Sequence, residues 1–156
     1  MTNPRDVVSA ERLIHAPAAA IFDVIADPAR HPEIDGSGTV LKARPGSSSR
    51  LSAGATFGMD MKLGVRYGMV STVTEFDEGR LIAWSPKPAS GRGARFIGRI
   101  WRYELEPVEG GTRVRETWDI SREGFRFFLR YANASRTKRD MAKSLERLDK
   151  LVTSGP

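Results

Sequence analysis

Apolar and polar residues alternate through the middle of the chain, from Ala55 to Ile120. Alternation with a period of two places successive side chains on opposite faces of an extended strand, so each strand has one apolar face. Turn sequences such as Glu109-Gly110-Gly111 separate the alternating runs. The pattern predicts an antiparallel meander whose apolar face must be covered by another element.

The region before this meander predicts a strand followed by short helices. Residues 7–16 alternate as a strand does. Pro17 suits the first turn of a helix, and the helix ends before Pro28, because a residue that precedes proline is pushed out of the helical region. Residues 29–38 are rich in turn formers and predict a short helix or loop, and 39–44 predict another strand.

The C-terminal third carries two apolar stripes at helical spacing. In chain order the stripes are Phe125, Phe128, Leu129 and Ala132, and then Met141, Leu145, Leu148 and Val152. At about 100° per residue the stripes fall on opposite sides of one continuous helix, so an unbroken helix could not point both at one core. We therefore expect a break within Asn133–Arg136, with Thr137 as the N-cap of a second helix.

Composition narrows the class of protein. The chain has 156 residues, 40% of them hydrophobic, which fits one folded domain spanning 1–156 rather than a disordered chain. It has no cysteine, which excludes a disulfide scaffold, a thiolate metal site and a cysteine nucleophile. With only two histidines a three-histidine zinc site is also excluded, and we expect neither a metal nor a cofactor.

Charge and hydropathy bear on location and partners. The N-terminal residues are too charged for the apolar core of a secretory signal, and no run approaches the ~20 apolar residues of a membrane span. These features predict a cytoplasmic protein without a transmembrane segment. The net charge of +6 is spread along the chain and interleaved with acids, which makes nucleic acid an unexpected partner but leaves contact with an anionic membrane surface open.

Three segments carry a resemblance to a known family. They are ERLIHAPAAAIFDVIADPARHPEIDG at 11–36, WRYELEPVEGGTRVRETW at 101–118 and MAKSLERLDKLV at 141–152. The chain resembles the START-like superfamily and, within it, the polyketide cyclase/dehydrase-like (SRPBCC) and lipid-transport-like proteins with a Bet v 1-like fold. The resemblance implies an α+β helix-grip fold, in which a curved antiparallel β-sheet wraps around a long C-terminal helix and two short helices follow the first strand. It also implies an apolar tunnel between sheet and helix.

A set of mostly aromatic and methionine side chains is the candidate lining of this tunnel. Such side chains adapt to ligand shape and offer an occasional polar atom in an apolar wall, although they are equally typical of an ordinary core. The candidate ligand-binding residues are Phe57, Met59, Met61, Tyr67, Met69, Trp84, Arg99, Trp101, Tyr103, Trp118, Phe125, Phe128, Leu129 and Met141.

Two charged residues, Arg99 and Glu116, share strand parity with tunnel-facing aromatics. Buried charges need partners, so the two could pair with each other or with the polar group of a ligand, unless a bulge turns them to solvent. His31 and Asp35 lie four residues apart and could act as a general base and its orienting carboxylate. Asp35 precedes Gly36, which also suits a turn-stabilising role. His31, Asp35 and Glu116 are the candidate catalytic residues.

Three functions follow from these observations. We expect a non-catalytic protein, monomeric or homodimeric, that binds a small hydrophobic or amphipathic ligand, lipid-like or polyketide-like, in the tunnel. The first alternative is a polyketide cyclase or dehydratase in which cavity shape does much of the work and His31, Asp35, Tyr103 or Glu116 moves protons. The second alternative is an interaction protein that acts through the basic surface of its C-terminal helix.

Overall fold

The computed structural model describes residues 3–47, 49–89 and 97–154. Its strands form one antiparallel sheet of seven, in the order β1-β7-β6-β5-β4-β3-β2. The strands are β1 (Val7–Ile14), β2 (Val40–Ala43), β3 (Thr56–Leu63), β4 (Val65–Asp77), β5 (Leu81–Pro88), β6 (Ile100–Val108) and β7 (Gly111–Asp119). The helices are η1 (Pro4–Asp6), α1 (Ala18–Ile25), η2 (Pro28–Arg30), α2 (His31–Ile34) and α3 (Arg126–Thr153).

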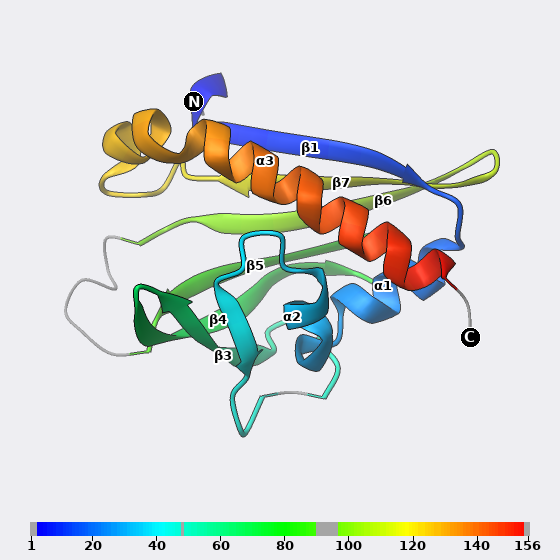
Figure 1. Ribbon diagram of the computed structural model, residues 1–156, viewed down its shortest axis with the longest axis horizontal. Coiled ribbons are helices and arrows are strands. Elements are labelled where there is room, and N and C mark those ends of the chain that lie inside the picture. The colour runs from blue at the N-terminus through cyan, green and yellow to red at the C-terminus, as the bar shows by residue number, and fades with distance from the viewer. Residues whose placement is uncertain (1–2, 48, 90–96, 155–156) are drawn as a thin grey trace.

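The sheet curls around α3, which runs diagonally across it (Figure 1). The first strand pairs with the last, with Val7 opposite Asp119 and Ile14 opposite Thr112. The predicted α+β helix-grip fold, with short helices after the first strand, is confirmed. Within the described residues, no helix combines the length and apolarity that a membrane span requires.

The apolar core lies where α1 and the C-terminal half of α3 meet the sheet. Ile21 and Phe22 of α1 and Ile14 of β1 are fully buried, and Leu145 and Leu148 of α3 pack in the same cluster. Pro17 stands at the N-cap of α1, as the sequence predicts. The Asp27 side chain accepts a hydrogen bond from the Ala29 N–H at 3.0 Å and so begins η2. The core is therefore concentrated at one end of the sheet.

The expected helix break within Asn133–Arg136 is wrong, because α3 runs without interruption from Arg126 to Thr153. The two apolar stripes do lie on different sides of the helix, but the fold buries the second and leaves most of the first exposed, with Leu129 half-buried. Met141, Leu145 and Leu148 are buried, whereas the side chains of the first stripe's Phe125 and Phe128 are 68% and 71% exposed. The sequence phase was correct, and the assumption that every apolar stripe must reach the core was not.

Apart from Leu129, which packs against Trp118, Ile120 and Met141, the inward face of the first half of α3 is polar or small. Arg130 forms an ion pair with Asp6, which is almost fully buried, and Arg126 lies 3.9 Å from the same carboxylate. Further along this face come Ala134 and Thr137, both half-buried. The first half of α3 is thus held against the sheet by buried charge pairing at the start of β1 and by the packing of Leu129 on Trp118, Ile120 and Met141.

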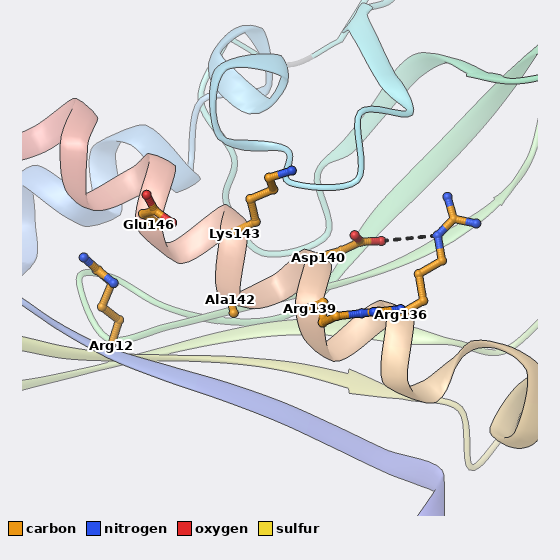
Figure 2. A pocket seen from close by; sticks show the side chains of 7 residues that line it. All are labelled: Arg12, Arg136, Arg139, Asp140, Ala142, Lys143 and Glu146. Atoms are coloured by element: carbon orange, nitrogen blue, oxygen red, sulfur yellow. Dashed lines mark ion pairs between the residues drawn. The ribbon is translucent and has the colours of Figure 1, made fainter.

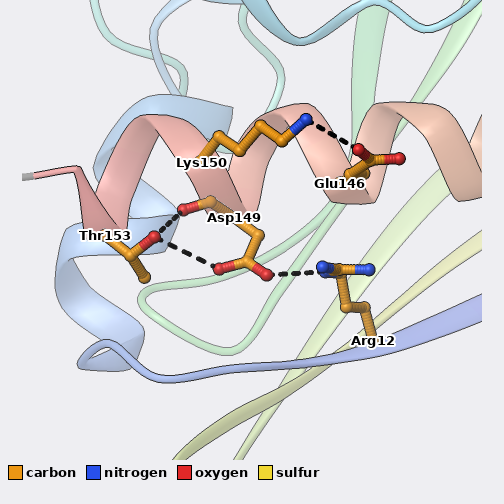
Figure 3. Close-up of polar contacts among 5 residues, drawn as sticks. All are labelled: Arg12, Glu146, Asp149, Lys150 and Thr153. Carbon is orange, nitrogen blue, oxygen red and sulfur yellow. Dashed lines mark hydrogen bonds and ion pairs between the residues drawn. The ribbon is translucent and has the colours of Figure 1, made fainter.

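The last turns of α3 are fixed to β1 and to themselves by polar contacts (Figure 3). Asp149 accepts a hydrogen bond from Arg12 of β1 at 2.7 Å. Within the helix, Lys150 pairs with Glu146 at 2.7 Å, and the Thr153 hydroxyl donates to the Asp149 carbonyl at 2.6 Å. Both ends of α3 are therefore tied to the same edge of the sheet, which leaves a fixed space between the middle of the helix and the central strands.

Candidate functional site

A cavity of about 330 Å³ lies between the sheet and α3, with α2 at one side. Strands β3 to β7 supply most of its wall, and Met141 and Ser144 of α3 close it from the other side. Of the candidate ligand-binding residues, those that line it are Phe57, Met59, Met61, Tyr67, Met69, Trp84, Arg99, Trp101, Tyr103, Trp118 and Met141. The other three lie outside its lining: Phe125 and Phe128 are exposed, and Leu129 packs against Trp118, Ile120 and Met141.

Aromatic rings form a continuous wall at one end of the cavity. The His31 imidazole stacks on Trp84 with 5.2 Å between ring centroids and 21° between planes. Phe57 meets both rings edge-on, at 5.3 Å from His31 and 5.6 Å from Trp84, and Trp84 lies 5.7 Å from Tyr103. Edge-on and offset stacking are the arrangements that aromatic quadrupoles favour, so this wall is rigid and apolar.

His31 is held in one tautomer by the backbone. Its Nε2 lies 2.8 Å from the Ile25 carbonyl oxygen, and because a carbonyl can only accept, Nε2 carries the proton and Nδ1 is an acceptor. Burial lowers the pKa of His31, although the Ile25 hydrogen bond and the charges of Asp27 and Asp35 oppose the shift. At neutral pH the imidazole is therefore uncharged.

Asp35 stabilises the turn that follows α2 rather than orienting His31. Its Oδ1 accepts hydrogen bonds from the Ser37 N–H at 3.0 Å and the Ser37 hydroxyl at 2.7 Å, and its Oδ2 accepts from the Val40 N–H at 2.9 Å. His31 bonds to Ile25 instead. Both residues line the cavity, but the predicted base–orienter pairing between them is not formed.

Glu116 is the most unusual side chain of the cavity. It lies on β7 directly opposite Tyr103 of β6 and is 4% exposed. Among the described residues, its Oε2 is the one buried side-chain oxygen or nitrogen that has no hydrogen-bond partner. Burial raises the pKa of Glu116 to about 8; the hydrogen bond with Tyr103 opposes this shift, and the charge of Asp35 adds to it. The carboxyl group is therefore mostly protonated at neutral pH.

Arg99 does not pair with Glu116, which corrects one of the two arrangements expected for these charges. Its guanidinium and its backbone N–H both donate to Glu123 Oε1, at 2.7 and 3.2 Å. The Glu123 side chain is only 2% exposed, so this pair is satisfied at the rim of the cavity. Of the two charged candidates, Arg99 already has an ionic partner, and Glu116 has a carboxyl oxygen available to a ligand.

Twelve further residues of the lining, most of them small or polar, were not among the candidates. The residues concerned are Ile34, Ser37, Thr39, Val40, Leu63, Ser71, Pro86, Asn133, Arg136, Thr137, Asp140 and Ser144. Ser71 could have been found, because it shares strand parity with Met69 and Val73. The α3 residues could not, because the expected break gave the wrong helix phase.

A second hollow, of about 610 Å³, lies on the outer surface beside α3 (Figure 2). It is lined by Arg12, Arg136, Arg139, Asp140, Ala142, Lys143 and Glu146. Both acidic and basic side chains line this hollow, and the Arg136 guanidinium lies 3.8 Å from the Asp140 carboxylate. Solvated charges of both signs are typical of a helix surface, so the cavity with its apolar wall is the better candidate site.

The chemistry available in the cavity is limited to hydrogen bonding and proton transfer. Within the described residues, no group of three or more His, Asp or Glu side chains is placed to hold a metal ion. Among the polar groups of the lining are a neutral imidazole, a tyrosine hydroxyl and a neutral carboxyl group, from His31, Tyr103 and Glu116. Tyr103 keeps its proton, since burial and the neighbouring Glu116 raise its pKa well above the ordinary value.

The chain is similar in sequence and in fold to known proteins. The chain is 38% identical over 113 residues to the uncharacterised protein Rv0088 of Mycobacterium tuberculosis; the match covers 71% of this chain but only 46% of that protein. Protein MLL2253 from Mesorhizobium loti has the same fold, with a TM-score of 0.70 at 18% identity over 96% of this chain and 98% of that one.

The Aha1 dimer from Colwellia psychrerythraea also shares the fold, with a TM-score of 0.64 at 17% identity over 94% and 95% of the two chains. Residues 5–153 match the family described as polyketide cyclase / dehydrase and lipid transport. This match spans every strand and all of α3. The chain belongs to the polyketide cyclase / dehydrase and lipid transport family.

Proposed function

We propose that the protein binds a small, largely apolar molecule that carries one hydrogen-bonding oxygen. The observation that carries this proposal is the combination of an apolar wall of about 330 Å³ with a single unpaired carboxyl oxygen on Glu116. A cavity of this size is at the lower end of the range for small-molecule sites, about 300–1,000 Å³. The family's description, which includes lipid transport, supports the same class of ligand.

Apolar contact supplies the affinity in this proposal. The methionines of β3 and β4 are flexible and polarizable, so they adjust to ligand shape, while the stacked rings of His31, Trp84 and Tyr103 give a fixed platform. Each Å² of apolar ligand surface removed from water contributes about 25 cal/mol. A planar ring system that lies along the aromatic wall would bury most of its surface.

Glu116 supplies the orientation. A buried polar atom without a partner costs roughly 1–3 kcal/mol, and a ligand oxygen next to Oε2 would remove that cost. A protonated carboxyl group can donate one hydrogen bond and accept another, so it suits a hydroxyl or carbonyl oxygen rather than a cation. The ligand's polar group therefore points toward β7, and its apolar part lies against β3 to β5.

Filling the cavity should abolish binding. N-phenyl-1-naphthylamine, an uncharged probe that fluoresces in apolar sites, should bind the wild type. Ser71→Phe places a ring in the cavity and should weaken binding at least ~10-fold, because the probe and the new ring compete for the same volume. Thr72→Phe is the matched control, since Thr72 is the next residue of β4 and is exposed on the opposite face.

Circular dichroism verifies that both variants are folded, and Met61→Trp gives a second filling variant should Ser71→Phe fail to fold. Probe binding that is the same in Ser71→Phe, Met61→Trp and wild type would place the probe elsewhere and contradict the proposal.

The polar subsite is tested with a matched ligand pair. Titration calorimetry should show 2-naphthol binding about tenfold tighter than 2-methylnaphthalene, which has nearly the same shape but no hydroxyl, because one hydrogen bond contributes about 1 kcal/mol or more. Glu116→Leu should remove this preference and Glu104→Leu, on the outer face of β6, should keep it. Equal affinity for both ligands in the wild type would refute the role of Glu116 while leaving the apolar cavity in place.

The second candidate function is catalysis in the same cavity, and the protonation state of Glu116 is what favours it. A carboxyl group that keeps its proton near pH 7 beside Tyr103 could protonate the carbonyl oxygen of a bound polyketide-like chain. Incubation with a triketide thioester, followed by mass spectrometry, separates the two functions. Recovery of unchanged thioester supports binding alone, and turnover that disappears in Glu116→Gln would establish the enzyme.

A further inference from the structure

The beginning of α3 presents an aromatic patch to solvent, made of Phe125, Phe127, Phe128 and Tyr131. These side chains are between 67% and 71% exposed. Exposed aromatics in this number on one helix end need a reason, since a contiguous exposed apolar patch is characteristic of a binding surface. The patch lies at the opposite end of α3 from the apolar core (Figure 1).

The patch is held in place by contacts beneath it. Phe127 and Tyr131 lie one helical turn apart, with 5.2 Å between ring centroids. The Arg130 guanidinium lies 5.7 Å from the centre of the Phe127 ring, and Arg130 is itself fixed by its ion pair with the buried Asp6. The aromatic side chains therefore project from a helix that cannot easily rotate to bury them.

The charge around the patch is mainly positive. Residues 122–139 contain six Lys and Arg and a single acid, Glu123, which is buried and paired with Arg99. Arg126 and Arg130 face Asp6, and Arg136 faces Asp140. The exposed bases left without an ion pair among the described residues are Arg122, Lys138 and Arg139. Lys138 is seven residues after Tyr131 and Arg139 is eleven after Phe128, so both continue the same helix face. Both are exposed. The aromatic patch thus continues into a cationic surface.

The exposed aromatic side chains and the neighbouring bases together indicate what kind of partner covers the patch. A second copy of the chain would bring the same Lys and Arg side chains together, and like charges at a contact cost several kcal/mol. An anionic lipid bilayer meets both features, since phenylalanine and tyrosine insert at the headgroup boundary and the bases pair with lipid phosphates. We propose that the aromatic patch, with Lys138 and Arg139, docks the protein on an anionic membrane surface.

Docking through the patch would bring one end of the cavity close to the lipid. Asn133 and Arg136, on the turns that follow the patch, are part of the cavity lining. A ligand that enters or leaves between α3 and the rim strands would then cross a shorter distance through water. This consequence links the patch to the proposed binding function, but the docking itself does not depend on it.

Vesicle co-sedimentation tests the docking. The purified protein should sediment with vesicles of equimolar phosphatidylcholine and phosphatidylglycerol, should bind phosphatidylcholine vesicles only weakly, and should be released by added salt. The triple variant Phe127→Ala/Phe128→Ala/Tyr131→Ala should lower the partition coefficient about 100-fold. Lys138→Glu/Arg139→Glu should lower it about tenfold or more on the mixed vesicles.

Two matched controls test whether the effect depends on where the substituted residues lie or only on the change in charge and apolar surface. Arg80→Glu/Arg113→Glu changes the net charge by the same amount at exposed sites in the β4–β5 turn and near the start of β7, and should leave binding unchanged. Leu13→Ala removes another exposed apolar side chain and should do the same. Ser71→Phe, which fills the cavity, should bind vesicles as well as the wild type, so failure of the cavity proposal and failure of docking give different results.

Two results would overturn the proposal. One is the absence of sedimentation with mixed vesicles in the wild type. The other is a dimer in sedimentation velocity that the triple alanine variant converts to monomer, since the patch would then be covered by a second copy.

Discussion

Glu116→Gln should become progressively more stable than the wild type as the pH rises from below 4.5 to 8, by about 4 kcal/mol in total. Glutamine is nearly isosteric with the protonated carboxyl group and never ionises. The measurement is urea denaturation of both proteins at several pH values, with the difference in unfolding free energy plotted against pH.

The sign follows from the direction of the pKa shift. The unfolded chain releases the Glu116 proton near pH 4.5, while the folded chain keeps it until about pH 8. Below pH 4.5 both states are protonated, so ionisation of Glu116 contributes nothing to the difference in stability. Between these values the unfolded state is favoured by ionisation, so the wild type loses stability that Glu116→Gln retains. His31, whose pKa is lowered, acts in the opposite direction but equally in both proteins.

Glu104→Gln is the control for this experiment, because Glu104 is the next residue after Tyr103 and is exposed on the outer face of β6. Its difference from the wild type should be nearly flat over the same pH range. A flat profile for Glu116→Gln as well would mean that the carboxyl group ionises in the folded state as it does in water, and the neutral hydrogen-bonding subsite would have to be abandoned.

Gly36→Ala should destabilise the protein by about 3 kcal/mol or more, because Gly36 lies directly against the backbone of α3. A Cβ at this position would be 2.2 Å from the Asp140 carbonyl oxygen and 2.6 Å from the Ser144 nitrogen. These are backbone atoms that cannot rotate away. The Gly36 N–H also donates to the Ser144 hydroxyl at 2.8 Å, and separation of the segment from α3 would break this bond.

Gly38→Ala is the comparison for this substitution. Gly38 has a positive φ of 75°, but a Cβ there would meet no atom within 4 Å. The expected cost is the strain of a left-handed alanine, about 1 kcal/mol. Equal losses for the two variants in thermal and urea denaturation would show that conformational strain, and not the close approach to α3, is the reason for glycine at 36.

The meander and the short helices could be predicted because they depend on local pattern. Alternation from Ala55 onward gives strands whatever their neighbours are, and Pro17 and Pro28 restrict the backbone directly. The lining of the cavity followed from the same parity, which is why Met59, Trp84 and Glu116 face one space.

What could not be predicted depends on partners far away in the sequence. Arg99 and Glu116 share a parity, but the pairing of Arg99 with Glu123 is decided by the rim of the sheet. The first turns of α3 are held by the ion pair between Arg130 and Asp6, which are separated by 124 residues. The pattern of apolar residues within 125–152 contains no information on this contact with Asp6. The exposure of the first stripe could therefore not be inferred from the sequence.

The protein contains three tryptophans, Trp84, Trp101 and Trp118, and all three line the cavity. Its entire indole emission therefore originates from the walls of one site, with no contribution from a tryptophan elsewhere in the chain. Trp101 and Trp118 lie 6.3 Å apart across neighbouring strands, close enough to exchange excitation energy. The three tryptophans thus form an intrinsic fluorescence probe of the cavity. Their emission wavelength and anisotropy should change when a ligand fills it, and no added label is needed.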